Sequence, residues 1–192
     1  DDKILTAWNG LMIETMAKAA RVFGDNKYLE AAQRAARFIE ANLLKDGKLL
    51  RRYRQGEAGV EATLDDTAYF IQGLLALYEA DFDPAWLVLA QKIQNIQDGR
   101  LGDDEGGYFY TSSEDKSLIR RSKDYHDGAK PNSNGVAVLN LMKLYHFTFE
   151  KRFFEKAKKS LLNAVADVSA YPSAHSQLLM AVDAYLERFK EI

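Results

Sequence analysis

Three segments of the chain repeat one short pattern: Tyr28-Leu29-Glu30-Ala31-Ala32, Trp86-Leu87-Val88-Leu89-Ala90 and Phe153-Phe154-Glu155-Lys156-Ala157. In each segment an aromatic residue is followed by an apolar residue and, four positions after the aromatic one, by alanine. This spacing places the aromatic residue and the alanine on one face of a helix. The segments recur after roughly 60 residues, which is longer than a tetratricopeptide unit of about 34. We therefore predict repeated helix pairs, with the extra length in the connections.

Apolar residues at helical spacing predict three antiparallel pairs and one further helix. The predicted ranges are 8–22 with 28–44, 64–80 with 84–96, 133–147 with 151–168, and 173–189 for the last helix, which is expected to have no partner. The turns within pairs are short, whereas the links between pairs are long, so the first helices should all begin at the same end. These first helices are apolar on most sides, as buried inner helices are. The sequence thus predicts an all-α fold, a partial α/α toroid.

Two segments between the pairs have the alternation of short strands. The first runs over 46–53, and the second combines 106–111 with 117–120. We expect two short β-hairpins on the rim beside the starts of the inner helices. Loops of this length in a compact domain are usually functional.

Composition narrows the classes of function. A chain of 192 residues is expected to form a single α/α-toroid-like domain over residues 1–192. A net charge of −2 gives no electrostatic surface for nucleic acid. No apolar run approaches the ~18 residues that span a membrane, and no signal peptide is recognisable, so we expect a cytoplasmic protein without a membrane partner.

Cysteine is absent, and no His, Asp and Glu set has the spacing of a known metal site, so neither metal nor cofactor is expected. The chain starts Asp1-Asp2-Lys3 without Met, and three pairs are fewer than a closed toroid needs. We therefore expect a piece of a longer toroid. Its uncovered flanks predict a homo-oligomer or association with the rest of the toroid.

Asp65 and Asp66 stand at the predicted start of an inner helix, one turn before Tyr69. Two adjacent carboxylates beside a phenol suit general acid–base work on a sugar. A structural role is equally open for one of them, because Thr63 and Asp66 have capping-box spacing and acidic residues are favoured in a first helical turn. Both cannot cap the same N–H groups equally well, so the other stays a catalytic candidate.

The second long loop carries further candidates. Tyr108 follows two glycines and could stack on a sugar ring or simply pack within a hairpin. Cations at 120, 121 and 123 precede His126 and Asp127, an arrangement that suits binding of a carboxylate or phosphate but is also typical of solvated ion pairs. His175, before the last helix, is expected at the same rim.

Four motifs occur in an order that resembles the YyaL-like family, which includes spermatogenesis-associated protein 20. They are Asp2-Lys3-Ile4-Leu5-Thr6-Ala7-Trp8-Asn9-Gly10-Leu11-Met12, residues 64–75 (LDDTAYFIQGLL), Gly106-Gly107-Tyr108-Phe109, and Asp127-Gly128-Ala129-Lys130-Pro131-Asn132-Ser133-Asn134. The resemblance covers nearly the whole chain. It implies the α/α-toroid region of that family, without its N-terminal thioredoxin-like domain. The family usually has Pro-Ser-Gly-Asn where this chain has residues 131–134.

The resemblance implies a toroid similar to N-acylglucosamine 2-epimerases and six-hairpin glycosidases. Together with the topology it gives two sets of candidates at one concave rim. The catalytic set is Asp65, Asp66, His126, Asp127 and His175. The substrate-binding set is Trp8, Asn9, Tyr69, Tyr108, Arg120, Lys123 and Asn134.

Two functions are open on this basis. The first is a carbohydrate-active domain, epimerase-like or glycosidase-like, that binds a small sugar ligand at the N-termini of the inner helices. The second is a non-catalytic binding or interaction module that assembles with another domain or chain. A rise in melting temperature with sugars favours the first, because a ligand of the native state stabilises it.

Overall fold

The computed structural model describes residues 2–115 and 119–187, and these fall into two compact units. The first unit extends to Arg100 and the second begins at Leu101, at the end of a helix. The described residues form seven α-helices and a small antiparallel sheet, so the predicted all-α class is confirmed. The single domain predicted over residues 1–192 stays a prediction.

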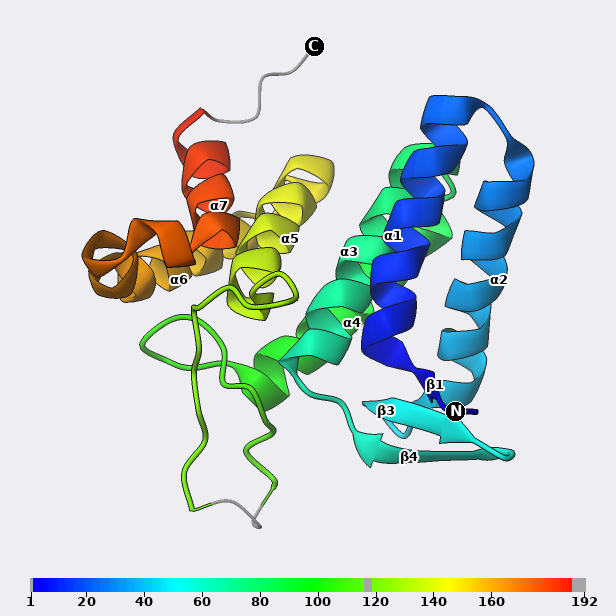
Figure 1. Cartoon of the computed structure of the whole chain (residues 1–192), viewed down its shortest axis with the longest axis horizontal. Helices are drawn as coiled ribbons and strands as arrows, with labels where there is room; N and C mark the ends of the chain where they lie inside the picture. The colour runs from blue at the N-terminus through cyan, green and yellow to red at the C-terminus, as the bar shows by residue number, and fades with distance from the viewer. Residues whose placement is uncertain (1, 116–118, 188–192) are drawn as a thin grey trace. The chain divides into compact units, whose positions relative to one another are not determined.

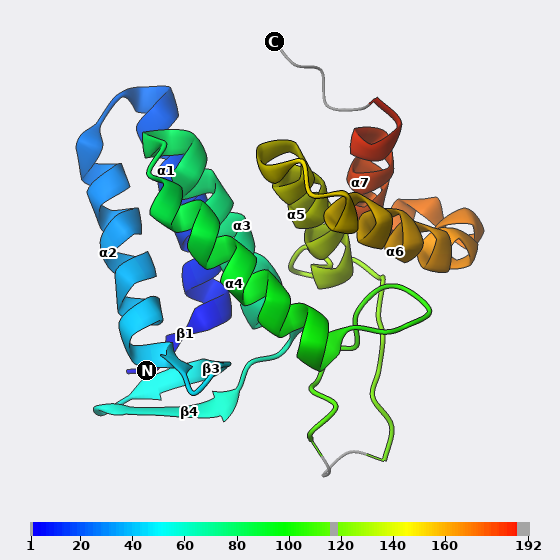
Figure 2. The ribbon, with the colours of Figure 1, turned by 180° about the vertical axis from the view of Figure 1, so that it is seen from behind.

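The first unit contains four helices and four strands (Figure 1 and Figure 2). In chain order they are β1 Ile4–Leu5, α1 Thr6–Phe23, α2 Asn26–Leu43, β2 Leu44–Lys45, β3 Lys48–Arg54, β4 Glu57–Glu61, α3 Leu64–Asp81 and α4 Pro84–Leu101. Strand β3 pairs antiparallel with each of the other strands. The register places Arg52 opposite Leu5 of β1 and Gly59 of β4. The first predicted hairpin is thereby confirmed, extended by β1 and β2.

Helices α1 and α3 pack closely because glycines lie where they cross. A Cβ atom on Gly10 would lie 2.5 Å from the carbonyl carbon of Tyr69, and one on Gly73 would lie 2.8 Å from the oxygen of Gly10. Only residues without a side chain permit this approach. Nearly all of α3 from Leu64 to Leu77 is buried, as expected of an inner helix.

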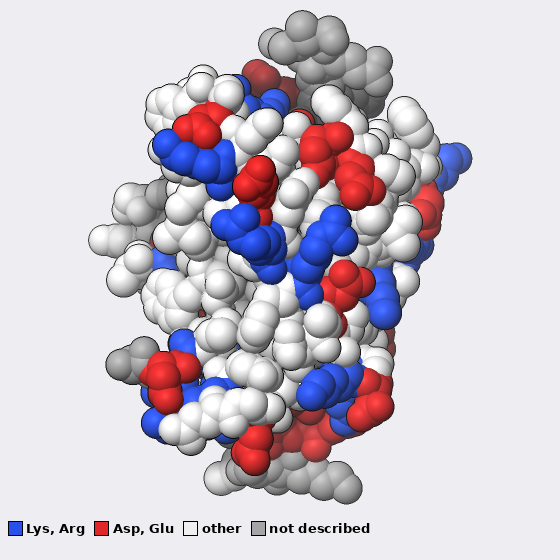
Figure 3. Space-filling view, turned by 90° about the vertical axis from the view of Figure 1, so that its right-hand side faces the viewer, with Lys and Arg blue, Asp and Glu red and all other residues white. Residues whose placement is uncertain are grey.

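Helix α2 has the amphipathic pattern predicted for an outer helix. Its buried side chains recur at helical spacing: Ala32, Ala36, Ile39 and Leu43. Figure 3 shows the face of the first unit on which α2 lies, and cations and carboxylates are interspersed there. Arg34 and Glu30, for example, form an exposed pair at 3.7 Å. Such a mixed surface is typical of a solvated face.

The second unit contains α5 Ser133–Thr148, α6 Lys151–Ala170, a 3-10 turn over Pro172–Ala174 and α7 Ser176–Glu187 (Figure 1). Helix α7 packs against α5, so the expectation that the last helix has no partner was wrong. Its partner is not adjacent in sequence, which is why periodicity alone missed it. A Cβ on Gly135 of α5 would lie 2.8 Å from Cγ of Gln177 in α7.

The second predicted hairpin lies partly outside the described residues, since 117 and 118 belong to its second strand. Within 102–115 and 119–132 no strand forms. Tyr108 makes one isolated antiparallel bridge with Gly102, and the Tyr110 N–H donates to the carbonyl of Ser122 at 2.8 Å. The loop is therefore held mainly by side chains.

The repeated sequence pattern corresponds to one turn geometry. In all three pairs the residue four positions before the repeated aromatic residue is left-handed: Gly24, Phe82 and Phe149 have φ of 66°, 57° and 57°. Each donates its N–H to the carbonyl four residues earlier, which ends the first helix of the pair. None of the described helices is long and apolar enough to cross a lipid bilayer.

Candidate functional site

Asp66 joins the N-termini of two helices in the first unit. Its Oδ2 accepts hydrogen bonds from the N–H and the hydroxyl of Thr63, both at 2.9 Å, which forms the capping box of α3. Its Oδ1 accepts the N–H of Ala7 in the first turn of α1 at 3.0 Å. Burial raises the pKa of Asp66, and the bonds to Thr63 oppose that rise. Both carboxylate oxygens thus serve the fold.

The other candidates of the first unit differ in accessibility. Trp8 is 61% exposed on α1, whereas Tyr69 is 1% exposed and packs inside, which favours a packing role for its ring. Asp65 is also buried, beside Asp66 at the start of α3. The Asn9 amide donates to the carbonyl of Leu5 at 2.8 Å, a bond within its own helix start.

In the second unit Asn134 fastens the long loop to α5. Its Oδ1 accepts the N–H of Tyr108 at 2.8 Å, and its Nδ2 donates to the Tyr108 carbonyl at 3.0 Å. The amide therefore pairs with the backbone of Tyr108 as a neighbouring strand would. Nδ2 also lies 3.0 Å from the carbonyl of Asp124. The Tyr108 side chain is 1% exposed, so it too packs inside.

Asp127 holds the start of α7. Its Oδ2 accepts the N–H of Gln177 at 2.8 Å, and its Oδ1 accepts the N–H of Asn132 at 2.8 Å. Asn132 in turn caps α5, since its side chain accepts the N–H of Gly135 at 3.0 Å. The motif around residues 127–134 therefore fixes two helix N-termini, and asparagine at 132 supplies the cap.

His126 and His175 lie in contact at the start of α7. Their ring centroids are 5.6 Å apart and the rings are nearly perpendicular, at 86°. His175 is 6% exposed, and its Nδ1 lies 2.8 Å from the carbonyl of Tyr171. A carbonyl only accepts, so Nδ1 carries the proton and Nε2 of the neutral ring keeps a lone pair. His126 is exposed.

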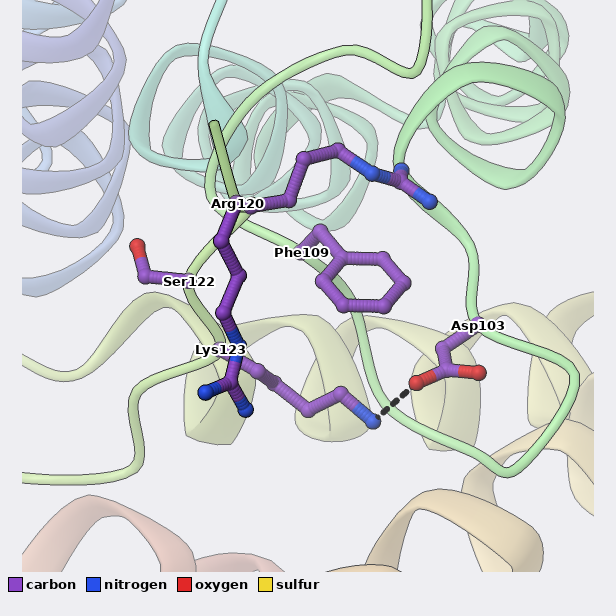
Figure 4. A pocket seen from close by; sticks show the side chains of 6 residues that line it. Asp103, Phe109, Arg120, Ser122 and Lys123 are labelled. Carbon is purple, nitrogen blue, oxygen red and sulfur yellow. Dashed lines mark ion pairs between the residues drawn. The ribbon is translucent and has the colours of Figure 1, made fainter. Parts of the chain in front are cut away.

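A basic pocket of about 820 Å³ opens in the same unit. Figure 4 shows its lining, with Phe109 among the basic side chains and an ion pair between Lys123 and Asp103. The guanidinium carbon of Arg121 lies 3.8 Å from the centroid of the Phe109 ring. The lining residues are Asp103, Phe109, Arg120, Arg121, Ser122 and Lys123.

Lys123 anchors one wall of this pocket. Its Nζ lies 2.5 Å from Asp103 and donates to the Gly106 carbonyl at 2.7 Å and to Asn163 of α6 at 3.2 Å. The hydrogen bond from Lys123 is the main reason why the pKa of Asp103 lies below its ordinary value. The phenol of Tyr125 also donates to Asn163, and burial raises the pKa of Tyr125.

The predicted site residues divide between the two units. Trp8, Asn9, Asp65, Asp66 and Tyr69 belong to the first unit. The second unit holds the others, Tyr108, Arg120, Lys123, His126, Asp127, Asn134 and His175, and hydrogen bonds or ring contacts join most of them through one loop. Convergence of both sets on one concave surface stays a prediction.

Sequence reasoning did not select Asp103, Phe109 or Asn163. Asp103 and Asn163 are separated from Lys123 by 20 and 40 residues, so no local pattern announces them. The sequence indicates Arg121 only as one of three clustered cations. Among residues 2–115 and 119–187 no group of three or more His, Asp or Glu side chains is arranged to hold a metal ion.

No protein-family model matches the chain. The chain is 34% identical to human spermatogenesis-associated protein 20 over 205 aligned positions, and 30% identical to uncharacterized protein B0495.5 of Caenorhabditis elegans over 190. The first alignment covers the whole chain and the second covers 95% of it, but the chain spans only 26% of the length of either relative. The family resemblance predicted from the four motifs is thereby confirmed.

Solved structures with the same fold are carbohydrate-active α/α-toroid enzymes. A GH76 α-mannanase of Bacteroides thetaiotaomicron superposes with a TM-score of 0.71 at 18% identity, over 86% of this chain and 45% of the enzyme. Cellobiose 2-epimerase of Spirochaeta thermophila gives 0.68 at 21% identity, over 85% and 43%. At these identities the similarity establishes the fold.

Proposed function

We propose that this chain, which is related over its whole length to spermatogenesis-associated protein 20, acts on a sugar by acid–base chemistry of the epimerase or isomerase type. His126 and His175 are the proton-transferring pair. The relationship of the fold to carbohydrate enzymes supports the substrate class. The observation that carries the proposal is the contact between the two imidazoles beside the N-terminus of α7.

The proposed proton transfers use the exposed ring of His126 and the Nε2 atom of His175. At the carbon next to the carbonyl of an open-chain sugar, a C–H bond breaks, its proton passes to an imidazole, and the electron pair moves onto the carbonyl oxygen. The imidazolium then returns the proton to the former carbonyl carbon, while the proton of the neighbouring hydroxyl passes to the former carbonyl oxygen. An aldose thereby becomes a ketose with no net gain or loss of protons, and the reverse reaction returns a proton to the first carbon. Because the two rings are in contact, a sugar does not fit between them. In the proposal the exposed ring of His126 contacts the sugar, and Nε2 of His175 exchanges protons with His126.

The carboxylates support a glycosidase-like mechanism less well. Such a mechanism needs two carboxyl groups free to act on the glycosidic bond. Each oxygen of Asp66 and of Asp127 already accepts a backbone N–H. These two aspartates therefore act as helix caps in the proposal, and the proton chemistry falls to the histidines.

The test is hydrogen exchange at carbon. The protein is incubated with mono- and disaccharides in D2O, and deuterium at the carbon next to the anomeric centre is followed by NMR. We expect incorporation that His126→Gln and His175→Gln each reduce by about 100-fold or more. His146→Gln, which changes the third histidine of the same unit, is the matched control. No incorporation with any sugar would contradict the proposal.

One comparison keeps the glycosidase-like mechanism as the second candidate. An α-1,6-mannanase of Salegentibacter superposes with a TM-score of 0.67, and its inactive variant has two consecutive aspartates replaced by asparagine. Consecutive aspartates occur three times in this chain, at 1–2, 65–66 and 103–104, and of these Asp65 and Asp66 stand at the start of the inner helix α3. If Asp65 acts on a glycosidic bond, Asp65→Asn abolishes hydrolysis of α-1,6-mannotriose while circular dichroism is unchanged.

Exposed apolar side chains on α1 support the remaining candidate, an interaction module. Trp8 and Met12, one turn apart, are 61% and 53% exposed. The aligned part of this chain covers less than half of each of these two structural neighbours. The remaining helices of a longer toroid would cover such an exposed apolar face. Light scattering of the wild type and of the double variant Trp8→Ser/Met12→Ser tests the interaction module. Association of the wild type that the double variant abolishes supports it.

A further inference from the structure

We propose that the basic pocket of the second unit binds the carboxylate or phosphate group of an acidic sugar derivative, with Arg120 and Arg121 as its ligands. The anion site itself stands on the pocket alone. Recognition of the sugar part of the ligand rests on the function proposed above.

The charges around the pocket do not balance. Three cations, Arg120, Arg121 and Lys123, line it together with one carboxylate, Asp103. Lys123 and Asp103 are paired at 2.5 Å. Neither arginine forms an ion pair with a carboxylate in the part of the chain that the structure describes. Two guanidinium groups therefore remain to attract an anion, which they bind with planar, paired donors.

Arg121 carries the second observation. Its Nη1 atom is buried yet has no hydrogen-bond partner among the described residues. A buried donor without an acceptor costs free energy, and native proteins rarely keep one unless a ligand or water completes it. The guanidinium is already held against the face of Phe109, so its donors are fixed before an anion arrives.

The walls of the pocket are also fixed. Lys123 is tied to Asp103, to the Gly106 carbonyl and to Asn163. We therefore assign Lys123 a positioning role and leave the direct contacts to the arginines. A volume of about 820 Å³ accommodates more than a bare ion, since small-molecule sites usually measure about 300–1,000 Å³. Phe109 adds an apolar surface of the kind that sugar rings contact.

Calorimetric titration tests the site with glucose 6-phosphate, glucuronate, inorganic phosphate and neutral glucose as probes. We expect an acidic sugar to bind at least about 10-fold more tightly than glucose, and raised salt to weaken it. Binding of glucose 6-phosphate alone identifies a phosphate site, and binding of glucuronate alone identifies a carboxylate site. Failure of all three anions, or equal binding of glucose, would overturn the proposal.

The variants locate the binding. Arg120→Gln and Arg121→Gln should each weaken the acidic sugar by about 10-fold or more. Arg120 is exposed, so its replacement leaves the fold intact even if Arg121→Gln disturbs Phe109. Lys158→Gln, which removes an exposed cation of α6, is the control and should bind as the wild type does. Unchanged binding in both arginine variants would also overturn the site.

This outcome is separable from that of the proposed function. Anion binding without deuterium exchange would support the anion site and contradict the proposed acid–base function. Exchange with neutral sugars, and no preference for acidic ones, does the reverse.

Discussion

The two units use the same device at their helix N-termini but connect their helices differently. In the first unit the Asp66 carboxylate accepts the N–H of Ala7 at the start of α1, and in the second the Asp127 carboxylate accepts the N–H of Gln177 at the start of α7. Each aspartate thereby joins residues more than 45 positions apart. Anchoring by a buried or half-buried carboxylate is thus common to both units.

The links before α3 and before α5 differ in their regular structure and in the ion pairs of their charged side chains. In the first unit the link between α2 and α3 forms a sheet, and neighbouring cations are paired, as Arg100 with Glu61 at 2.5 Å and Arg54 with Asp2 at 2.7 Å. In the second unit the link before α5 has no strand in its described part, and its cations outnumber its carboxylate in the pocket: Asp103 is paired with Lys123 and also interacts electrostatically with Arg121. Each link keeps a buried guanidinium nitrogen without a hydrogen-bond partner among the described residues, Nε of Arg52 in β3 and Nη1 of Arg121. The difference is that Arg121 lines the basic pocket of the second unit.

The largest effect is expected where α1 crosses α3. Gly10→Ala would place a Cβ atom 2.5 Å from backbone, which cannot yield easily, and should lower the free energy of unfolding by about 3 kcal/mol. Gly135→Ala, the counterpart in the second unit, first meets the flexible side chain of Gln177 and should cost about half as much. Denaturant titration measures both.

A helical glycine in open space is the control for this pair. Nothing lies within 4 Å of a Cβ atom on Gly99 of α4, so Gly99→Ala should stabilise by up to about 1 kcal/mol through helix propensity. Equal losses for Gly10→Ala and Gly135→Ala would remove the distinction between the two crossings.

Replacement of the two anchoring aspartates should rank next. In Asp66→Asn an amide NH₂ group replaces one carboxylate oxygen and faces the N–H donors of Thr63 or Ala7, which then lose their acceptor. The free energy of unfolding should fall by about 2 kcal/mol. Asp127→Asn loses one of two backbone bonds and should cost about 1 kcal/mol. Thermal unfolding of the variants checks the order; a greater loss for Asp127→Asn would show that the second unit depends more on its anchor.

The pH dependence of stability should have opposite signs for Asp66 and Asp103. Burial raises the pKa of Asp66, so the native state binds its proton more tightly, and the stability present below the ordinary value of 3.8 is lost as pH rises through the raised pKa. Lys123 lowers the pKa of Asp103, so its contribution is present above 3.8 and is lost as pH falls through the lowered pKa.

Denaturant unfolding from about pH 3 to pH 6 distinguishes these slopes. Asp66→Asn should remove a decrease of stability with rising pH, and Asp103→Asn should remove an increase. Slopes of the same sign for the two variants would contradict the assignment of burial to one carboxyl and of the cation to the other.

The smallest effect concerns the turns. The first unit has Gly24 at the left-handed end of its first helix, whereas the second has Phe149, which is exposed and has φ of 57°. Phe149→Gly should raise the free energy of unfolding by about 0.5–1 kcal/mol, because glycine adopts this conformation without strain. Phe149→Ala keeps the Cβ atom and should change little. A loss of stability for Phe149→Gly would mean that its ring contributes contacts.

The sequence alone determined the helices, the turns between them and the family resemblance. These depend on residues within a few positions of one another: the pattern at Tyr28, Trp86 and Phe153 already implied the pairs, because helical periodicity is local. The candidate loop was located by the same means, since its cations and histidine are contiguous.

Only the tertiary structure decided what each polar side chain does. The capping box of Thr63 and Asp66 could be predicted from their spacing, but the bonds from Ala7 to Asp66 and from Gln177 to Asp127 join residues 59 and 50 positions apart. The ring contact of His126 with His175 and the hydrogen bond from Lys123 to Asn163 likewise join distant segments. A carboxylate or imidazole takes its role from the donors and charges around it, and those are set by packing rather than by neighbours in the chain.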